Sequence, residues 1–438
     1  MDRPDLGILR FSARILSTRV WKRRVVFWLG ALAVGLAAIL FADLSNRAQF
    51  LSQKLFALAW WLPLVVTPFG FLLCAWLTQS IAPAASGSGI PQAMAARTYR
   101  SPRTRTALLG PKVFLSKIAI TTLGLVVGAS VGREGPTVQI GAGLMLLFGR
   151  WGGIRREQGL ILAGSAAGIA GAFNTPLAGV VFAIEEMSRS FEARTNGLVL
   201  YAVIIAGLAS LSLVGDYTYF GTTHVTVGGP RDWLTLVVVG VIGGLAGGAF
   251  GRGMLEGSRA IGKWCRAAPL PRRLLVAGIC GLVVAAIGVF AEGSTFGTGY
   301  EQARAAIEGQ PVVDGFWIGK FAATLVTALS GIPGGIFAPS LSVGAGLGDW
   351  IGGFLGGTAG LAAVLGMASY FAGAVQSPMT AFVIIMEMTN NQSNLVPLML
   401  ASIIGYAVSR WVAPEPLYHG LSLAFAGKPA AGTPKPAV

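Results

Sequence analysis

The chain has 438 residues, of which 54% are hydrophobic and only 12% are charged, whereas an average soluble domain has roughly 25% charged residues. This composition excludes a soluble globular protein and indicates an integral membrane protein with no room for a separate soluble domain. The formal net charge of +15 could suit nucleic acid, but the basic residues gather beside apolar runs, so we expect the lipid bilayer as a partner and no nucleic acid.

Apolar runs near the length that a bilayer requires recur along the chain. The clearest are residues 25–42, 55–77, 198–214, 234–250, 274–290 and 316–329. We expect these runs to form membrane helices. Glycine is abundant, at 62 residues, which favours tightly packed or interrupted membrane helices.

The distribution of charge predicts the topology. Basic residues precede the first apolar run, follow the second and fill a later loop: Arg3, Arg10, Arg14, Arg19, Lys22, Arg23 and Arg24; Arg97, Arg100, Arg103, Arg105 and Lys112; Arg252, Arg259, Lys263, Arg266, Arg272 and Arg273. The connection after run 274–290 is acidic, with Glu292, Glu301, Glu308 and Asp314 against Arg304. Basic loops stay in the cytoplasm, so we expect the N-terminus there.

Both ends of the chain read as cytoplasmic segments outside the membrane. Residues 1–24 form a basic lead-in, and an amphipathic helix lying on anionic lipid is one form that it can take. The alanine- and proline-rich tail, 426–438, is expected to be disordered.

The sequence has no pattern typical of a metal site, a disulfide framework or an enzyme. Three scattered cysteines, Cys74, Cys265 and Cys280, and two isolated histidines, His224 and His419, form no ligand cluster. We also find no nucleophile–base pair and no nucleotide loop. We therefore expect no cofactor and no enzymatic activity. A membrane-embedded enzyme that uses Glu134 as its acid–base group stays open only as the least favoured alternative.

One stretch, GREGP at 132–136, places a charged pair between apolar sequences. Charged residues inside a membrane are costly, so a functional role is the default interpretation. Pro136 suits the first turn of a helix, which predicts a helix from Pro136 to Gly149. Such a helix spans only about 20 Å of the roughly 30 Å bilayer core, so we expect a broken helix with its N-terminus at depth. An Arg133–Glu134 salt bridge is the structural alternative, disfavoured because sequence neighbours seldom face each other.

The chain contains an internal duplication. Residues 132–144 match 335–347 at six of thirteen positions, and residues 170–187 match 372–389 at six positions, pairing Glu185 with Glu387. Two matched blocks in the same order, at shifts of 203 and 202, indicate repeats. We expect an N-terminal segment (1–24), a first membrane repeat (25–215), a connecting segment (216–232), a second membrane repeat (233–425) and a tail (426–438).

Membrane repeats of this kind are commonly related by an in-plane pseudo-two-fold axis, with a binding site where their broken helices meet. Helices that begin near Pro136 and Pro339 are then expected to converge near the bilayer midplane. Free N–H groups and the positive dipole ends at their N-termini favour an anion.

Four motifs together resemble the CLC family of chloride channels and chloride/proton antiporters. They are GSGIP at 87–91, GREGP at 132–136, GIFAP at 335–339 and a late tyrosine, Tyr418. The resemblance covers nearly all the hydrophobic chain. It implies an all-α integral membrane protein of two inverted-topology repeats with tilted and broken helices. It also implies a homodimer in a bacterial plasma membrane, in which each subunit has its own anion pathway.

The resemblance also implies the anion-binding residues. The hydroxyls of Ser88 and Tyr418 and the backbone N–H groups of Ile336 and Phe337 are expected to bind a central anion. The backbone amides from Arg133 to Gly135 are expected to serve the outer part of the pathway. Partial charges of this kind replace the water around chloride without holding the ion too tightly to leave. Serine at position 88 favours chloride over nitrate or fluoride in this family.

Two glutamates carry the expected proton chemistry by the same resemblance. Glu134 corresponds to the gating glutamate, whose carboxylate competes with chloride for the N–H groups and moves aside when protonated. Glu186 corresponds to the internal proton-transfer glutamate, where family channels tend to have an apolar residue. This favours chloride/proton antiport, and a passive chloride channel is the closest alternative. Glu185 is expected to be structural, and Glu186 has the alternative of being an ordinary water-facing acid at a helix end.

Overall fold

The computed structural model describes residues 18–425 except residues 100, 189–192, 216–217 and 224. Residues 1–17 of the predicted N-terminal segment (1–24) and the predicted tail (426–438) therefore lie outside the described residues. The first half contains α2 Thr18–Ala57, α3 Leu62–Ile81, α4 Ile90–Thr98, α5 Pro102–Leu109, α6 Pro111–Val126, α7 Glu134–Trp151, α8 Glu157–Phe173, α9 Pro176–Phe182 and α10 Ala193–Val214. The second half contains α11 Pro230–Cys265, α12 Pro269–Phe290, α13 Tyr300–Ile307, α14 Phe316–Leu329, α15 Phe337–Leu355, α16 Leu361–Val375, α17 Pro378–Met388, α18 Leu395–Val412 and α19 Leu417–Ser422.

The expected all-α membrane architecture is confirmed for the described part of the chain. Its regular elements are helices, and the extended pairings within it are two isolated β-bridges. Among the described residues, seven helices are long and apolar enough to cross a membrane. The apolar runs 198–214, 234–250, 274–290 and 316–329 each lie within one helix, namely α10, α11, α12 and α14.

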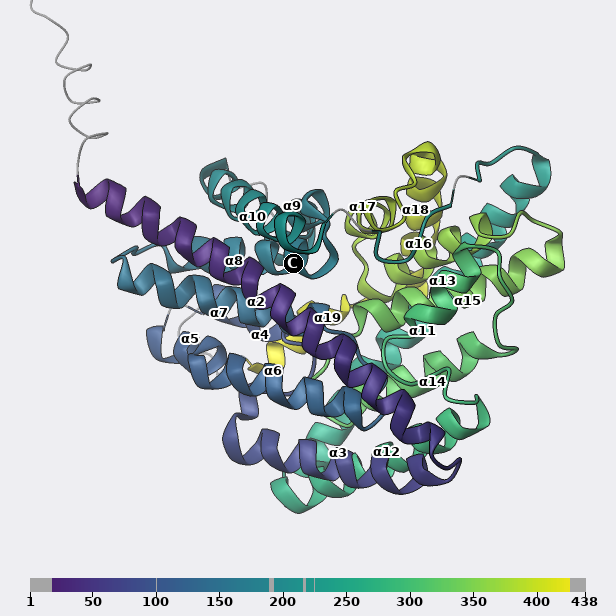
Figure 1. The fold of residues 1–438 in the computed structure, drawn as a ribbon, viewed down its shortest axis with the longest axis horizontal. Coiled ribbons are helices and arrows are strands. Elements are labelled where there is room, and N and C mark those ends of the chain that lie inside the picture. Colours follow the sequence, from purple (N-terminus) through teal and green to yellow (C-terminus); the bar gives the residue numbers. More distant parts are fainter. Residues whose placement is uncertain (1–17, 100, 189–192, 216–217, 224, 426–438) are drawn as a thin grey trace, which may run out of the picture.

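The prediction of a single span at 55–77 is wrong. Helix α2 continues to Ala57, and α3 begins at Leu62 after a short turn. Pro63 lies at the N-terminus of α3, where its missing N–H costs nothing, so it starts a new helix rather than extending the old one. Residues 18–24, expected to belong to a separate lead-in, are the first turns of the 40-residue helix α2. In Figure 1 α2 crosses the molecule as one long diagonal helix.

The two helices expected to begin at Pro136 and Pro339 begin two residues earlier. Helix α7 starts at Glu134 and α15 starts at Phe337, so each proline is the third helical residue. The N–H groups of the first turn have no intrahelical partner, so proline is tolerated there as well as at the first position. The broken-helix prediction stands, because both helices begin among buried residues.

The two repeats meet through equivalent residues. The N–H of Gly132 donates to the carbonyl of Gly335 at 2.7 Å, and the N–H of Gly335 donates back at 2.8 Å, as an antiparallel bridge. A reciprocal pairing of equivalent residues is what a two-fold axis between inverted repeats produces. Figure 1 shows the earlier part of the chain, in purple and blue, beside the later part, in green, with α19 near the centre.

Glu185 and Glu387, which occupy equivalent positions in the two repeats, form equivalent hydrogen bonds. Glu185 accepts hydrogen bonds from two N–H groups at the start of α17, at 3.0 and 2.6 Å, and from the Thr380 hydroxyl at 2.7 Å. Glu387 accepts hydrogen bonds from two N–H groups at the start of α9, at 3.1 and 2.7 Å. Each carboxylate thus caps a helix of the other repeat, where the helix dipole favours negative charge. The structural role predicted for Glu185 is confirmed.

Candidate functional site

Three loops that were predicted from separate motifs lie side by side. Gly87 pairs with the chain at Pro333, through hydrogen bonds from Gly87 N–H to the Ile332 carbonyl (3.2 Å) and from Gly334 N–H to the Gly87 carbonyl (3.1 Å). The Gly132–Gly335 bridge joins the third loop to these two. The loops lead into α4, α7 and α15, so the N-termini of three helices converge inside the protein. Such an arrangement concentrates positive dipole ends and favours an anion.

Glycine is required where these backbones approach. A Cβ on Gly335 would lie 2.9 Å from the backbone nitrogen of Gly135, and a Cβ on Gly135 would overlap the hydroxyl of Ser88. Gly89, immediately before α4, has φ of 105°, which a residue with a side chain rarely adopts. Only glycines therefore allow the three helix N-termini to come this close.

Ser88 and Tyr418 bring two hydroxyls to the same place. Both residues are buried, and the hydroxyls lie near enough to each other to interact. Neither forms a hydrogen bond of ordinary geometry with any described residue. The Tyr418 ring packs against the Phe337 ring at the start of α15, with centroids 5.9 Å apart. The structure thus brings Ser88, Tyr418 and the start of α15 at Phe337 together, and their binding of an anion stays a prediction.

The Glu134 side chain is fully buried beside the same helix N-termini. Its carboxylate lies near the backbone N–H groups of Ala338 and of Glu134 itself. The hydroxyl of Tyr219 donates to its Oε1 at 3.4 Å. The Glu134 carboxyl group therefore lies at the first turn of α15, where Ala338 provides a further backbone amide beside those of Ile336 and Phe337.

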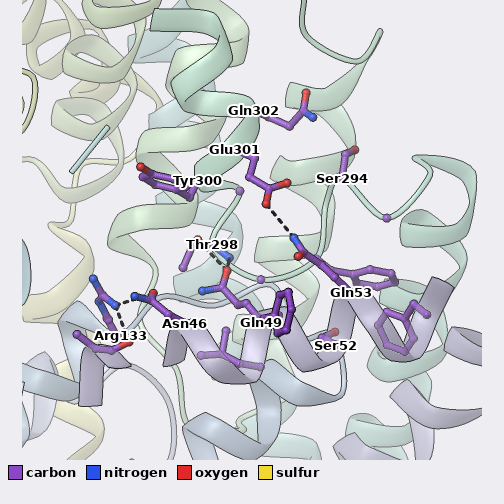
Figure 2. A pocket seen from close by; sticks show the side chains of 18 of the residues that line it. Asn46, Gln49, Ser52, Gln53, Arg133, Ser294, Thr298, Tyr300, Glu301 and Gln302 are labelled. Atoms are coloured by element: carbon purple, nitrogen blue, oxygen red, sulfur yellow. Dashed lines mark hydrogen bonds between the residues drawn. The ribbon is translucent and has the colours of Figure 1, made fainter. Parts of the chain in front are cut away.

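The Arg133 side chain points away from Glu134. Its Nη1 donates to the Ala42 carbonyl at 2.9 Å and to Asn46 Oδ1 at 3.0 Å, as Figure 2 shows for Asn46, and its guanidinium lies 5.3 Å from the centroid of the Tyr219 ring. No Arg133–Glu134 ion pair is present among the described residues. The salt-bridge alternative is therefore wrong.

Glu186 is buried on a single π-helical turn, Ala183–Ser188, that follows α9. Its Oε2 accepts a short hydrogen bond from the Ser377 hydroxyl, which comes from the second repeat. The alternative of an ordinary acid facing water is wrong, because the residue is only 1% exposed. Glu134 and Glu186 both lie within electrostatic range of the Tyr418 hydroxyl.

Figure 2 shows a cavity, which has a volume of about 1430 Å³. One of its lining residues, Tyr219, contacts Glu134. The cavity lies between α2 and the segment that leads into α13, and both Arg133 and Tyr219 line it. Hydrogen bonds cross it from Thr298 to Gln49 (3.0 and 3.1 Å) and from Gln53 to Glu301 (3.0 Å). It belongs to the side of the molecule that carries the acidic connection. Glu134 therefore lies between this cavity and the hydroxyls of Ser88 and Tyr418.

Two fully buried lysines beside these loops were not predicted from the sequence. Lys117 donates to the carbonyls of Ala85 (2.6 Å) and Gly87 (2.7 Å), in the loop before α4. Lys320 donates to the carbonyls of Thr295 (2.9 Å) and Gly297 (2.7 Å), in the loop before α13. The internal duplication could have predicted this pair of lysines. They are 203 residues apart, and GTGYEQA at 297–303 repeats GSGIPQA at 87–93.

The sequence and the fold both match known transport proteins. A family model described as voltage gated chloride channel matches residues 70–410. A slow cyanobacterial Cl⁻/H⁺ antiporter has a similar crystal structure, with TM-score 0.80 and 25% identity, covering 93% of this chain and 99% of that chain. A CLC-type fluoride/proton antiporter gives TM-score 0.75 and 26% identity, covering 91% of this chain and 98% of that chain.

A eukaryotic CLC transporter shares the fold at TM-score 0.75 and 21% identity, covering 92% of this chain and 74% of that chain. These solved relatives are described as antiporters or transporters, which places the chain among membrane transport proteins rather than enzymes. Convergent helix N-termini, a multi-pass apolar fold and a family match over most of the sequence lead to one conclusion: the chain belongs to the CLC family of voltage gated chloride channels and related transporters.

Proposed function

We propose that the protein is a chloride/proton antiporter in which Glu134 competes with the transported anion. The position of the Glu134 carboxylate carries this proposal. It lies against the N-terminus of α15, with the hydroxyls of Ser88 and Tyr418 on one side. On the other side lies the cavity between α2 and the segment that leads into α13, which we call the outer cavity. A carboxylate and a chloride ion need the same partial positive charges, so they exclude each other from the N-terminus of α15.

Chloride is bound by hydroxyls and amides in this proposal. Ser88 and Tyr418 donate their hydroxyls, and the N–H groups of Ile336 and Phe337 complete the central site. The amides from Arg133 to Gly135 serve the outer part of the pathway. None of these donors carries a full charge, so chloride loses its water without becoming trapped. The guanidinium of Arg133, which would bind chloride more strongly, is held by Ala42 and Asn46 instead.

Glu134 and Glu186 are the two proton-carrying groups. Ionised Glu134 occupies the amides, and protonation removes its attraction to them, so the side chain can move towards the cavity while chloride enters. Glu186, buried beside Ser377, passes protons between Glu134 and the cytoplasmic side. Two relatives of at least 25% identity are described as proton-coupled antiporters, one for chloride and one for fluoride. Ser88 within GSGIP favours chloride for this chain.

We infer that the protein is a homodimer in a bacterial plasma membrane with one pathway in each subunit. In this proposal the pathway residues of each subunit form one complete pathway, so each subunit transports independently. The outer cavity opens on the side with the acidic connection, which we assign to the outside by the positive-inside rule.

Measurement of chloride and proton fluxes in liposomes tests the proposal. A pH gradient should drive chloride uphill through the wild-type protein, whereas a passive channel cannot do this. Glu134→Ala should retain anion flux and lose proton coupling, and Glu186→Gln should lose coupling more selectively. Glu256→Gln, which removes an exposed acid paired with Arg252, is the matched control and should leave coupling unchanged. Persistent proton pumping by both Glu134→Ala and Glu186→Gln would contradict the assignments.

A further inference from the structure

Tyr219 is the residue that joins the gate region to the outer cavity. It lies in the segment between α10 and α11, which connects the two repeats, and it is only 6% exposed. Its hydroxyl donates to Glu134 Oε1 at 3.4 Å, and its side chain also lines the cavity. Tyr219 therefore lies between the carboxylate and the cavity.

The ring of Tyr219 is held from several directions. Phe173 at the end of α8 and Tyr300 at the start of α13 pack edge-on against it, with centroids 5.5 and 5.6 Å away. Phe220 packs edge-on at 4.8 Å, and the Arg133 guanidinium lies 5.3 Å from the ring centroid. Contacts from both repeats thus fix the direction of the hydroxyl before any ion binds.

We propose that Tyr219 is a positioning residue that latches the Glu134 carboxylate in its inward, amide-bound position. This inference rests on the proposed role of Glu134 as gate. A hydroxyl forms a stronger hydrogen bond to an ionised carboxylate than to a protonated one. The latch therefore holds the ionised gate and releases the protonated one. The ring also stands on the route from Glu134 to the cavity, so the gate opens only when this contact breaks.

Other charged groups around Glu134 stay in place when the hydroxyl alone is removed. These groups include Arg133, Tyr418 and Glu186. Lys117 donates a hydrogen bond to the Gly87 carbonyl, in the loop that carries Ser88. The acids that line the cavity are Asp43, Glu292 and Glu301. Asp43 is itself paired with Arg47 at 2.8 Å. Because Tyr219→Phe keeps the ring and all these groups, a change in the pH profile reports on the lost hydroxyl.

The test compares Tyr219→Phe with Tyr300→Phe in proteoliposomes, by recording chloride flux against pH. Tyr300 is a matched control, because its ring packs on Tyr219 while its hydroxyl accepts a hydrogen bond from Arg304 (3.5 Å) instead of contacting Glu134. For Tyr219→Phe we expect the midpoint of acid activation to move to higher pH by about half a unit, with about two- to three-fold faster flux near neutral pH. Tyr300→Phe should match the wild type.

The same comparison in a Glu134→Gln background should abolish the effect of Tyr219→Phe, because the ionisable gate is gone. A Tyr219→Phe profile that superimposes on the wild type, or an equal shift in Tyr300→Phe, would overturn the latch. If the latch is overturned but Glu134→Ala retains chloride flux and loses proton coupling, the assignment of Glu134 as the gate still stands. If Glu134→Ala instead keeps full proton coupling, the gate and the latch are both wrong.

Discussion

Gly335→Ala adds one methyl group at the point where the two repeats meet. It therefore tests how closely the N-termini of α7 and α15 approach each other. Gly335 pairs with Gly132 through two reciprocal hydrogen bonds of 2.7 and 2.8 Å. A Cβ at Gly335 would lie 2.9 Å from the Gly135 nitrogen, 3.0 Å from Pro136 Cδ and 3.1 Å from the Gly132 carbonyl oxygen. All three contacts are with backbone or a rigid ring, so no flexible side chain can move aside. Gly335→Ala must therefore push the start of α7 away from the start of α15.

The cost of this displacement follows from two contributions. Overpacking a dense interior costs about 1–3 kcal/mol, and each lost backbone hydrogen bond costs about 0.5–1.5 kcal/mol. With two hydrogen bonds at risk, we expect Gly335→Ala to lower the free energy of unfolding by about 2–6 kcal/mol. The amides that face the anion move with the backbone, so we also expect the affinity for chloride to fall by about tenfold, which corresponds to only about 1.4 kcal/mol.

Thermal unfolding in detergent and chloride titration by calorimetry measure these two effects. Gly353→Ala is the matched control, since Gly353 lies on the same helix, α15, and a Cβ there meets nothing within 4 Å. It should leave chloride affinity unchanged and raise stability slightly, because alanine favours the helix over glycine. A Gly335→Ala protein as stable and as chloride-binding as the wild type would refute the proposed close approach of the helix N-termini.

Three further predictions concern the residues around this centre. Glu387→Ala should destabilise the protein by about 1–2 kcal/mol in thermal unfolding, because two N–H groups of α9 lose their cap, and Glu387→Gln should recover part of the loss. Ser377→Ala should slow proton flux while leaving chloride affinity unchanged, since Ser377 donates to Glu186 and not to the Ser88 hydroxyl; equal loss of both would argue against a proton role for Glu186. Lys320→Met should lower the yield of folded protein, because the carbonyls of Thr295 and Gly297 lose their donor at about 1–3 kcal/mol each, and wild-type stability would show that these hydrogen bonds contribute little.

Short motifs predicted the arrangement of this protein better than the sequence predicted where its helices begin and end. The GREGP and GIFAP motifs indicated two membrane helices with buried N-termini, and the structure places both starts against each other. The exact starts were wrong by two residues, because proline is tolerated anywhere in a first helical turn. The run 55–77 was misread as one span, because hydropathy alone does not reveal a turn between two apolar helices.

Contacts between distant residues explain what the sequence missed. Tyr219 lies in a connecting segment with no motif of its own, and its contact with Glu134 spans 85 positions of the chain. Lys117 and Lys320 belong to no motif, although the repeat of GSGIPQA as GTGYEQA relates the loops to which they donate hydrogen bonds. The sequence disfavoured a salt bridge between Arg133 and Glu134, but only the structure shows that the Arg133 side chain reaches α2.

The sequence by itself determined the membrane class, the duplication and the residue types that an anion pathway requires, because hydropathy, repeats and rare intramembrane charges are local properties of a chain. Only the tertiary structure decided which helix N-termini meet, where the Glu134 carboxylate lies and what holds it there. Those features depend on how two inverted repeats pack on each other, and packing between segments about 200 residues apart leaves no local mark in the sequence.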